Sequence, residues 1–154
     1  MASIGEGLGR VFNVVYSASG LDIPLTRATA VSFVNFLDAG TQTMVFTQTD
    51  SRGVNSEIDL NIFSQDPANL GSRVHAGPAV GGTWVQKDDG SDPNAYDNTT
   101  DATNDTVIVT VRAEQLADGY DQVQCTSGTG TCVAIIHDLV VQRKPANLRS
   151  SLVA

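Results

Sequence analysis

Two cysteines, Cys125 and Cys132, stand symmetrically about Gly128-Thr129. If these two residues form a two-residue turn, the flanking strands pair so that the cysteines lie directly opposite each other. Directly opposite residues in an antiparallel hydrogen-bonded pair have Cα atoms about 5.5 Å apart, a separation that a disulfide can bridge. Closing so short a loop would stabilise the fold by about 2–3 kcal/mol on the chain-entropy model. The alternative is two small buried residues that stay reduced.

His137 and Asp138 form a histidine–aspartate pair near the end of an apolar run. Neighbours in a strand point to opposite faces, so these two side chains cannot make the hydrogen bond that an acid–base pair needs. Alternation groups His137 with Val133 and Ile135, which predicts a structural role. His75 lies in a glycine-rich stretch that we expect to be a loop. Two histidines without matched ligand spacing do not predict a transition-metal site.

Residues 88–94 carry Asp88, Asp89 and Asp92, whose carboxylate oxygens are the ligands that calcium uses. The stretch does not follow the EF-hand register, and Pro93 stands where that loop needs flexibility, so a solvated polar loop is the alternative to a bound ion. The sequence contains no phosphate-binding loop, nucleophile elbow or dinucleotide fingerprint. We therefore expect no catalytic residues, no cofactor and no metal, and the chain is predicted not to be an enzyme.

The net charge is −8 over 154 residues, which argues against a nucleic-acid partner, because such proteins carry a basic stripe. No apolar run approaches the roughly 20 residues of a membrane span, so no membrane partner is expected. The charge is unevenly placed: nine of the seventeen acids lie in residues 88–121, whereas Arg143, Lys144 and Arg149 supply a third of the nine bases. An acidic body with a basic tail suits a protein that docks one end on an acidic partner. A solvated surface with a charged terminus is the alternative.

Strict alternation of apolar and polar residues predicts strands at 106–112 and 57–63. The side chains expected to be buried by this pattern are Val107, Val109, Val111, Ile58, Leu60 and Ile62. Residues 29–37 are apolar on both faces, as in a strand covered on both sides. Further strands are expected at 10–16, 42–49, 83–86, 120–125 and 132–141.

The order of these strands predicts an all-β fold, an antiparallel β-sandwich or jelly-roll-like domain of about eight strands. We expect hairpins between 29–37 and 42–49 and, through a type II′ turn at Gly128, between 120–125 and 132–141. The corner at 116–120 is similar to the tyrosine corner of Greek-key sandwiches, in which a tyrosine hydroxyl closes a crossover between sheets, although Cys125 follows Tyr120 by five residues rather than two. We expect this corner to be structural. One helical turn is expected near 113–116 or at Pro67. Residues 1–9 form a flexible arm, 10–143 one β domain, and 144–154 an extended tail.

Two stretches, residues 113–121 and 134–148, resemble small virion proteins of tailed bacteriophages of actinobacteria. The second stretch contains His-Asp-Leu-Val-Val-Gln-Arg-Lys-Pro-Ala-Asn-Leu, which is similar to a motif at the C-terminal end of those proteins. The resemblance covers about the last 40 residues, with a looser similarity between Gly81 and Thr106. It implies a virion protein, assembled in the host cytoplasm, that decorates the capsid or forms a minor part of it. No catalytic residues come with it.

The implied partners are the major capsid protein and other copies of this chain. For docking we expect the bases Arg143, Lys144 and Arg149 to meet an acidic groove, with Leu148 and Leu152 as apolar anchors. One alternative is a head–tail or tail component of the virion. Another is a carbohydrate-binding β-sandwich, for which Trp84, Tyr96 and Tyr16 are the aromatic candidates.

Overall fold

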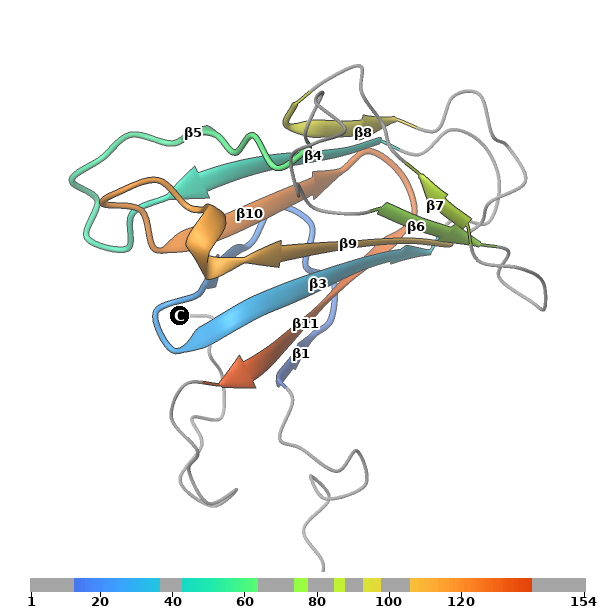
Figure 1. Ribbon diagram of the computed structural model, residues 1–154, viewed down its shortest axis with the longest axis horizontal. Coiled ribbons are helices and arrows are strands. Elements are labelled where there is room, and N and C mark those ends of the chain that lie inside the picture. The colour runs from blue at the N-terminus through green and yellow to red at the C-terminus, as the bar shows by residue number, and fades with distance from the viewer. Residues whose placement is uncertain are drawn as a thin grey trace, which may run out of the picture.

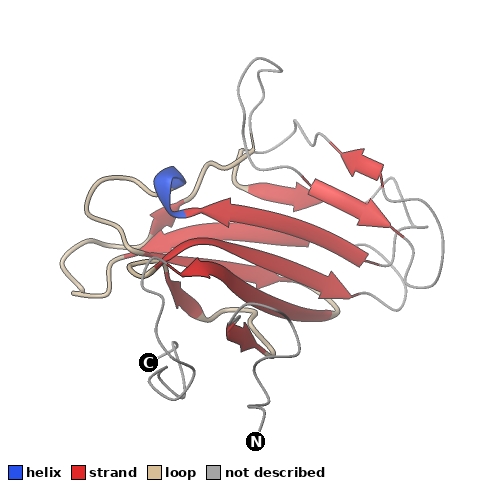
Figure 2. Cartoon of the chain, turned by 60° about the horizontal axis from the view of Figure 1, so that its bottom comes forward, coloured by secondary structure: helices blue, strands red, loops and turns tan. Residues whose placement is uncertain are grey.

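The computed structural model describes residues 13–36, 43–63, 74–77, 85–87, 93–97 and 106–139, and the regular secondary structure in these ranges is almost all β (Figure 2). The eleven strands found there are β1 (Asn13–Val15), β2 (Asp22–Pro24), β3 (Ala28–Phe36), β4 (Thr43–Thr49), β5 (Ile58–Asp59), β6 (Val74–Gly77), β7 (Val85–Lys87), β8 (Ala95–Asp97), β9 (Thr106–Arg112), β10 (Gln122–Ser127) and β11 (Thr131–Leu139). A single 3₁₀ turn, η2 (Ala113–Gln115), follows β9, at the position expected for a helical turn. The predicted all-β class is confirmed.

The strands form two antiparallel sheets that pack face to face (Figure 1). The six-stranded sheet has the order β1-β11-β3-β9-β6-β7, and the five-stranded sheet has the order β2-β10-β4-β5, with β8 also paired to β4. The pairing is nested, because β1 pairs with β11, β2 with β10, β3 with β9 and β4 with β8. Nested antiparallel pairs that alternate between two sheets define a jelly roll, the more specific of the two predicted architectures.

Aromatic side chains connect the two sheets through the core. Phe33 of β3 meets Phe46 of β4 edge to face, with ring centroids 5.7 Å apart. Phe46 meets Phe63 in the same geometry at 5.8 Å. Edge-to-face contacts stabilise such pairs beyond the burial of their area, so this row of rings helps to fix the spacing of the sheets.

Five of the six side chains predicted to be buried are buried, and one is not. Val107, Val109 and Val111 are fully buried, as are Leu60 and Ile62, but Ile58 is 43% exposed. The prediction for Ile58 is wrong because β5 is a two-residue edge strand rather than the long strand expected at 57–63. Ile58 lies opposite Gln48, near the end of the sandwich where polar loops replace the apolar core.

Both predicted hairpins are wrong. β3 and β4 belong to different sheets, and so do β10 and β11, so each connection crosses between sheets. Alternation along a strand is the same whichever neighbour it pairs with, and the nested pairing is set by residues far away in the sequence. The type II′ turn is absent as well: the left-handed backbone lies at Gly130 (φ +86°) and not at Gly128.

Three strands lie where loops were expected. β2 ends at Pro24 on an edge of the five-stranded sheet, a place where the missing proline N–H costs no ladder hydrogen bond. β6 and β8 lie within stretches that had been predicted to be loops, and β6 includes His75. The predicted arm 1–9 and tail 144–154 lie outside the described residues.

Candidate functional site

Cys125 and Cys132 face each other across the core rather than across a hairpin. Cys125 belongs to β10 and pairs with Phe46, whereas Cys132 belongs to β11 and pairs with Asn35 of β3. Both are buried free thiols, and a hydrogen bond links their sulfurs. The sequence thus predicted correctly that the two cysteines lie close together, but it did so from a hairpin that the structure does not contain.

The connection from β1 to β2 holds the two cysteine backbones together. The amide of Ala18 donates to the Cys132 carbonyl at 2.7 Å, and the amide of Gly20 donates to the Cys125 carbonyl at 2.9 Å. Burial raises the pKa of the Cys125 thiol well above its ordinary value of 9.0. The hydrogen bond from Cys125 lowers the pKa of Cys132, so Cys132 is the sulfur that ionises first.

The turn between β10 and β11 is attached to both sheets. The amide of Gly128 donates to the Thr43 carbonyl at 2.9 Å, at the start of β4. The buried Asn35 donates from Nδ2 to the Thr129 carbonyl at 3.1 Å, at the end of β3. A Cβ at Gly130 would lie 2.2 Å from the Phe36 carbonyl oxygen, so this position requires glycine.

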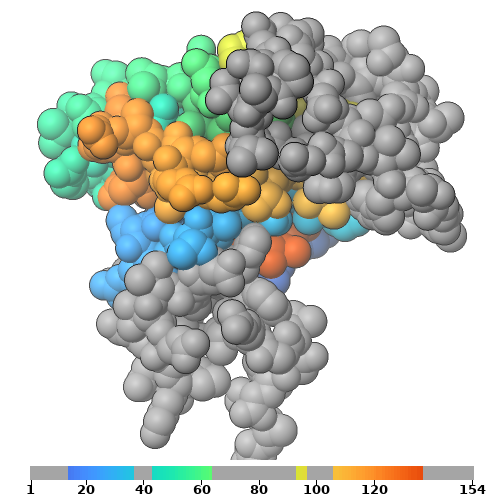
Figure 3. All heavy atoms as spheres, viewed as in Figure 1, coloured from blue at the N-terminus to red at the C-terminus, as the bar shows by residue number. Residues whose placement is uncertain are grey.

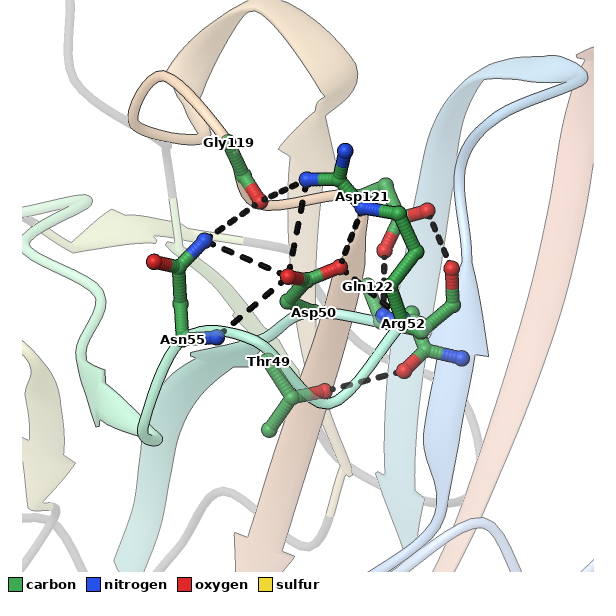
Figure 4. A network of polar contacts seen from close by, with 8 residues as sticks. Thr49, Asp50, Arg52, Asn55, Gly119, Asp121 and Gln122 are labelled. Atoms are coloured by element: carbon green, nitrogen blue, oxygen red, sulfur yellow. Dashed lines mark hydrogen bonds and ion pairs between the residues drawn. The ribbon is translucent and has the colours of Figure 1, made fainter.

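The densest polar network in the described part of the chain closes one end of the sandwich (Figure 4). Its centre is Asp50, at the end of β4, whose side chain is fully buried. Asp50 Oδ1 accepts from the amide (2.9 Å) and Nε (3.0 Å) of Arg52. Asp50 Oδ2 accepts from the amide (3.3 Å) and Nδ2 (3.2 Å) of Asn55. These bonds order the loop between β4 and β5.

The same network ties this loop to the tyrosine corner. Asn55 Nδ2 donates to the Gly119 carbonyl at 3.1 Å, and the Ser51 amide donates to Asp121 Oδ1 at 2.8 Å. The Tyr120 hydroxyl donates to the Ser56 carbonyl of the β4–β5 loop at 3.1 Å, and not to the backbone just before it; the connection at 116–120 does cross between the sheets. The β4–β5 loop (green) and the corner (orange) lie side by side at one end of the molecule (Figure 3). We call the residues of this network, 50–56 and 119–121, the end cluster.

The end cluster has the chemistry of a structural site. Hydrogen bonds from the Arg52 amide and guanidinium lower the pKa of Asp50, which is therefore held ionised. Both of its oxygens accept several hydrogen bonds, so neither is directed at a place where a substrate proton would lie. Within the described residues no three histidine, cysteine or acidic side chains gather as a metal site would require.

The structure places only some of the residues that the sequence singled out. Arg143, Lys144, Leu148, Arg149 and Leu152 lie outside the described residues, as do Asp88, Asp89, Asp92 and Trp84. His137 and Asp138 follow each other in β11, as expected. Tyr96 is only 3% exposed and packs in the core, so it offers no face to a sugar, whereas Tyr16 is 75% exposed.

No family model, curated protein or solved structure matches this chain. The roles of individual residues are therefore inferred from their positions and contacts in the structure. In the ranges that the structure describes, no helix is long and apolar enough to cross a membrane.

The end cluster is the feature that sequence reasoning missed. Asp50-Ser51-Arg52-Gly53 signals a turn, and Asp50 is suited to receive the amides that follow it. That local signal could have predicted the loop. Nothing local predicts that Asn55 and Ser51 reach the corner at 119–121, because the nested pairing brings the two segments together.

Proposed function

We propose that this chain is a non-enzymatic structural protein of a bacteriophage virion, which decorates or stabilises the capsid by binding the major capsid protein and neighbouring copies of itself. The observation that carries the proposal is the position of the first and last described strands. β1 and β11 are paired neighbours, with Asn13 opposite Ile136, so the first and last described strands begin and end at the same end of the six-stranded sheet. A rigid domain that presents both of these strand ends on one side suits a protein that contacts several neighbours at once.

The rigidity of the domain also supports a structural role. The sheets are joined by the Phe33–Phe46–Phe63 row, and the end cluster ties two loops together by hydrogen bonds between segments far apart in the sequence. A decoration protein binds other subunits and catalyses no reaction, so its role requires a rigid domain. The resemblance of residues 113–121 and 134–148 to virion proteins points the same way.

Cosedimentation with virion parts tests the proposal. Purified chain is mixed with separated heads and tails of the phage that encodes it, and the amount pelleted with each is measured. Saturable binding to heads is the expected result. Binding to tails alone would replace capsid decoration by the tail-component alternative, and binding to neither would reject a virion role. A glycan array run with the same preparation tests the carbohydrate-binding alternative.

A further inference from the structure

The two outer faces of the sandwich differ in chemistry. The outer face of the five-stranded sheet is polar, with Asp22 from β2 and Asp59 from β5 beside threonines and glutamines of β4 and β10. The side chains of β4 and β10 on this face are Thr43, Val45, Thr47, Thr49, Gln122, Gln124 and Thr126. This is the pattern of a sheet with one face in water.

The outer face of the six-stranded sheet is mostly apolar. Cross-strand register places Val14 beside Ile135 in one row, and Val133, Val34 and Ile108 side by side in the next. The apolar side chains of this face are Val14, Ala30, Val34, Phe36, Ile108, Val133 and Ile135, and we call this set the six-stranded face. It is the structural counterpart of the prediction that residues 29–37 are apolar on both sides.

Part of the six-stranded face is open at its margins. Val14 is 52% exposed and Phe36 is 48% exposed, Ile108, Val133 and Ile135 are half-buried, and Ala30 and Val34 between their neighbours are buried. Ser32 and Thr110 are polar residues in the middle of this face, and their hydroxyls form a hydrogen bond of 2.8 Å with each other. Contiguous apolar surface of this kind marks interaction sites on proteins.

We propose that the six-stranded face is the surface through which two copies of this chain associate. The argument for a second copy is electrostatic. The chain carries a net charge of −8, so two copies repel each other at most orientations. Among the described side chains of this face there is no carboxylate, and Arg112, at its margin, is paired with Glu114 at 3.1 Å. At the described side chains of this face, two acidic chains therefore approach without opposing like charges.

The area of the six-stranded face determines how tight a dimer we expect. Four strands about 4.8 Å apart and about 24 Å long present about 450 Å² in projection, roughly half of the 800 Å² per partner that stable complexes bury. We therefore expect a dimer that dissociates on dilution rather than a permanent one. The inference deepens the proposed function, because it specifies the surface through which neighbouring copies would meet.

Analytical ultracentrifugation of the full-length chain, without capsids, tests this inference separately from the virion proposal. Samples from about 1 μM to about 1 mM span the range in which a weak dimer forms. Val14→Glu is the main variant, because its side chain is half-exposed and the change is tolerated by the fold. Ile135→Glu is the second variant, in the same row. Val45→Glu is the matched control on the outer face of the five-stranded sheet, and circular dichroism checks that each variant folds.

The expected result is a concentration-dependent dimer that Val14→Glu and Ile135→Glu weaken by about tenfold or more and that Val45→Glu leaves unchanged. Added salt should strengthen the wild-type dimer, since it screens the repulsion between acidic chains. A wild-type chain that stays monomeric throughout the range overturns the inference, whatever else covers the face. A dimer that resists both variants overturns it too, because the interface then lies elsewhere. Either result leaves cosedimentation with heads free to succeed or fail.

Discussion

Cys125 of β10 and Cys132 of β11 are close in sequence yet belong to opposite sheets, and their thiols share a hydrogen bond through the core. Because the two sulfurs belong to different sheets, a disulfide between them would link the sheets covalently through the core. The amides of Ala18 and Gly20 hold both cysteine carbonyls, which keeps the two strands in place around the pair.

The thiol pair is expected to be protected in the folded protein and to form a disulfide after oxidation. Burial and the raised pKa of Cys125 keep that thiol protonated, so a water-soluble thiol reagent should label the native chain far more slowly than the unfolded chain. Exchange with oxidised glutathione during refolding should give an intramolecular disulfide and two molecules of reduced glutathione. The oxidised chain should be more stable by about 2–3 kcal/mol on the chain-entropy model.

Mass spectrometry and urea unfolding measure this pair of predictions. The Cys132→Ala variant is the control, because it cannot close the bond and should unfold identically with and without oxidant. Fast labelling of both thiols in the native protein would contradict the protection that the structure shows.

Leu60→Ala is expected to cost about 2–5 kcal/mol, because the side chain is 1% exposed and truncation leaves a cavity in the core. Ile58→Ala, two residues earlier on the same alternating stretch, should cost less than about 1 kcal/mol because Ile58 lies at the rim. Urea unfolding of both variants compares them directly. Equal costs would mean that β5 extends further than the two residues found.

Gly130→Ala is expected to destabilise the fold by at least about 2 kcal/mol. The left-handed backbone costs an alanine about 1–2 kcal/mol, and the new Cβ would overlap the Phe36 carbonyl, which adds about 1–3 kcal/mol. Gly53→Ala is the matched control: its φ is +66°, but no atom lies within 4 Å of the added Cβ. Thermal melts should show the larger loss at Gly130, and similar losses at both positions would show that the close approach is relieved by a small backbone shift.

The end cluster should make stability depend on acid pH. Hydrogen bonds from Arg52 lower the folded-state pKa of Asp50 below its ordinary value of 3.8, so between the two values the unfolded chain binds more protons than the folded chain. The stabilisation is therefore complete above pH 3.8 and is lost as the pH falls through the lowered pKa. Asp50→Asn should be less stable than the wild type at neutral pH, and the difference should shrink in acid.

Urea midpoints measured from about pH 6 to about pH 3 follow this loss. Asp118→Asn, at an exposed position of the corner, is the control and should track the wild type. A constant difference between the wild type and Asp50→Asn over the whole range would show that the charge of Asp50 contributes nothing.

Deleting residues 145–154 is expected to abolish docking on heads while leaving the fold intact. Leu148 and Leu152 are the proposed anchors, because exposed ion pairs contribute only about 0–1 kcal/mol each. Reversing the charges of Arg143, Lys144 and Arg149 should weaken docking and reduce its sensitivity to salt. Cosedimentation at two salt concentrations measures both effects, and full binding by the truncated chain would show that the tail is merely solvated.

The sequence alone predicted the five longest strands, β3, β4, β9, β10 and β11, and the buried face of β9. Val107, Val109 and Val111 alternate with Thr106, Ile108, Thr110 and Arg112, and that period of two is a property of the strand alone. The apolar character of both faces of residues 29–37 indicated a strand covered on both sides, but the second sheet packs against only one face of β3, and Phe36 at its end is 48% exposed. Residues 116–120 were sufficient to predict a corner between two strands, but not that the Tyr120 hydroxyl binds Ser56 of a distant loop.

The pairing of the strands became known from the three-dimensional structure alone. A crossing between sheets and a hairpin leave the same alternation in the sequence, so the segment from Cys125 to Cys132 fits both. The choice depends on contacts between distant segments, such as Gly128 with Thr43 and Asn55 with Gly119, which no local pattern encodes. β11 lies between β1 and β3 in one sheet, and β10 lies between β2 and β4 in the other. The two cysteines therefore meet across the core and not as neighbours on paired strands.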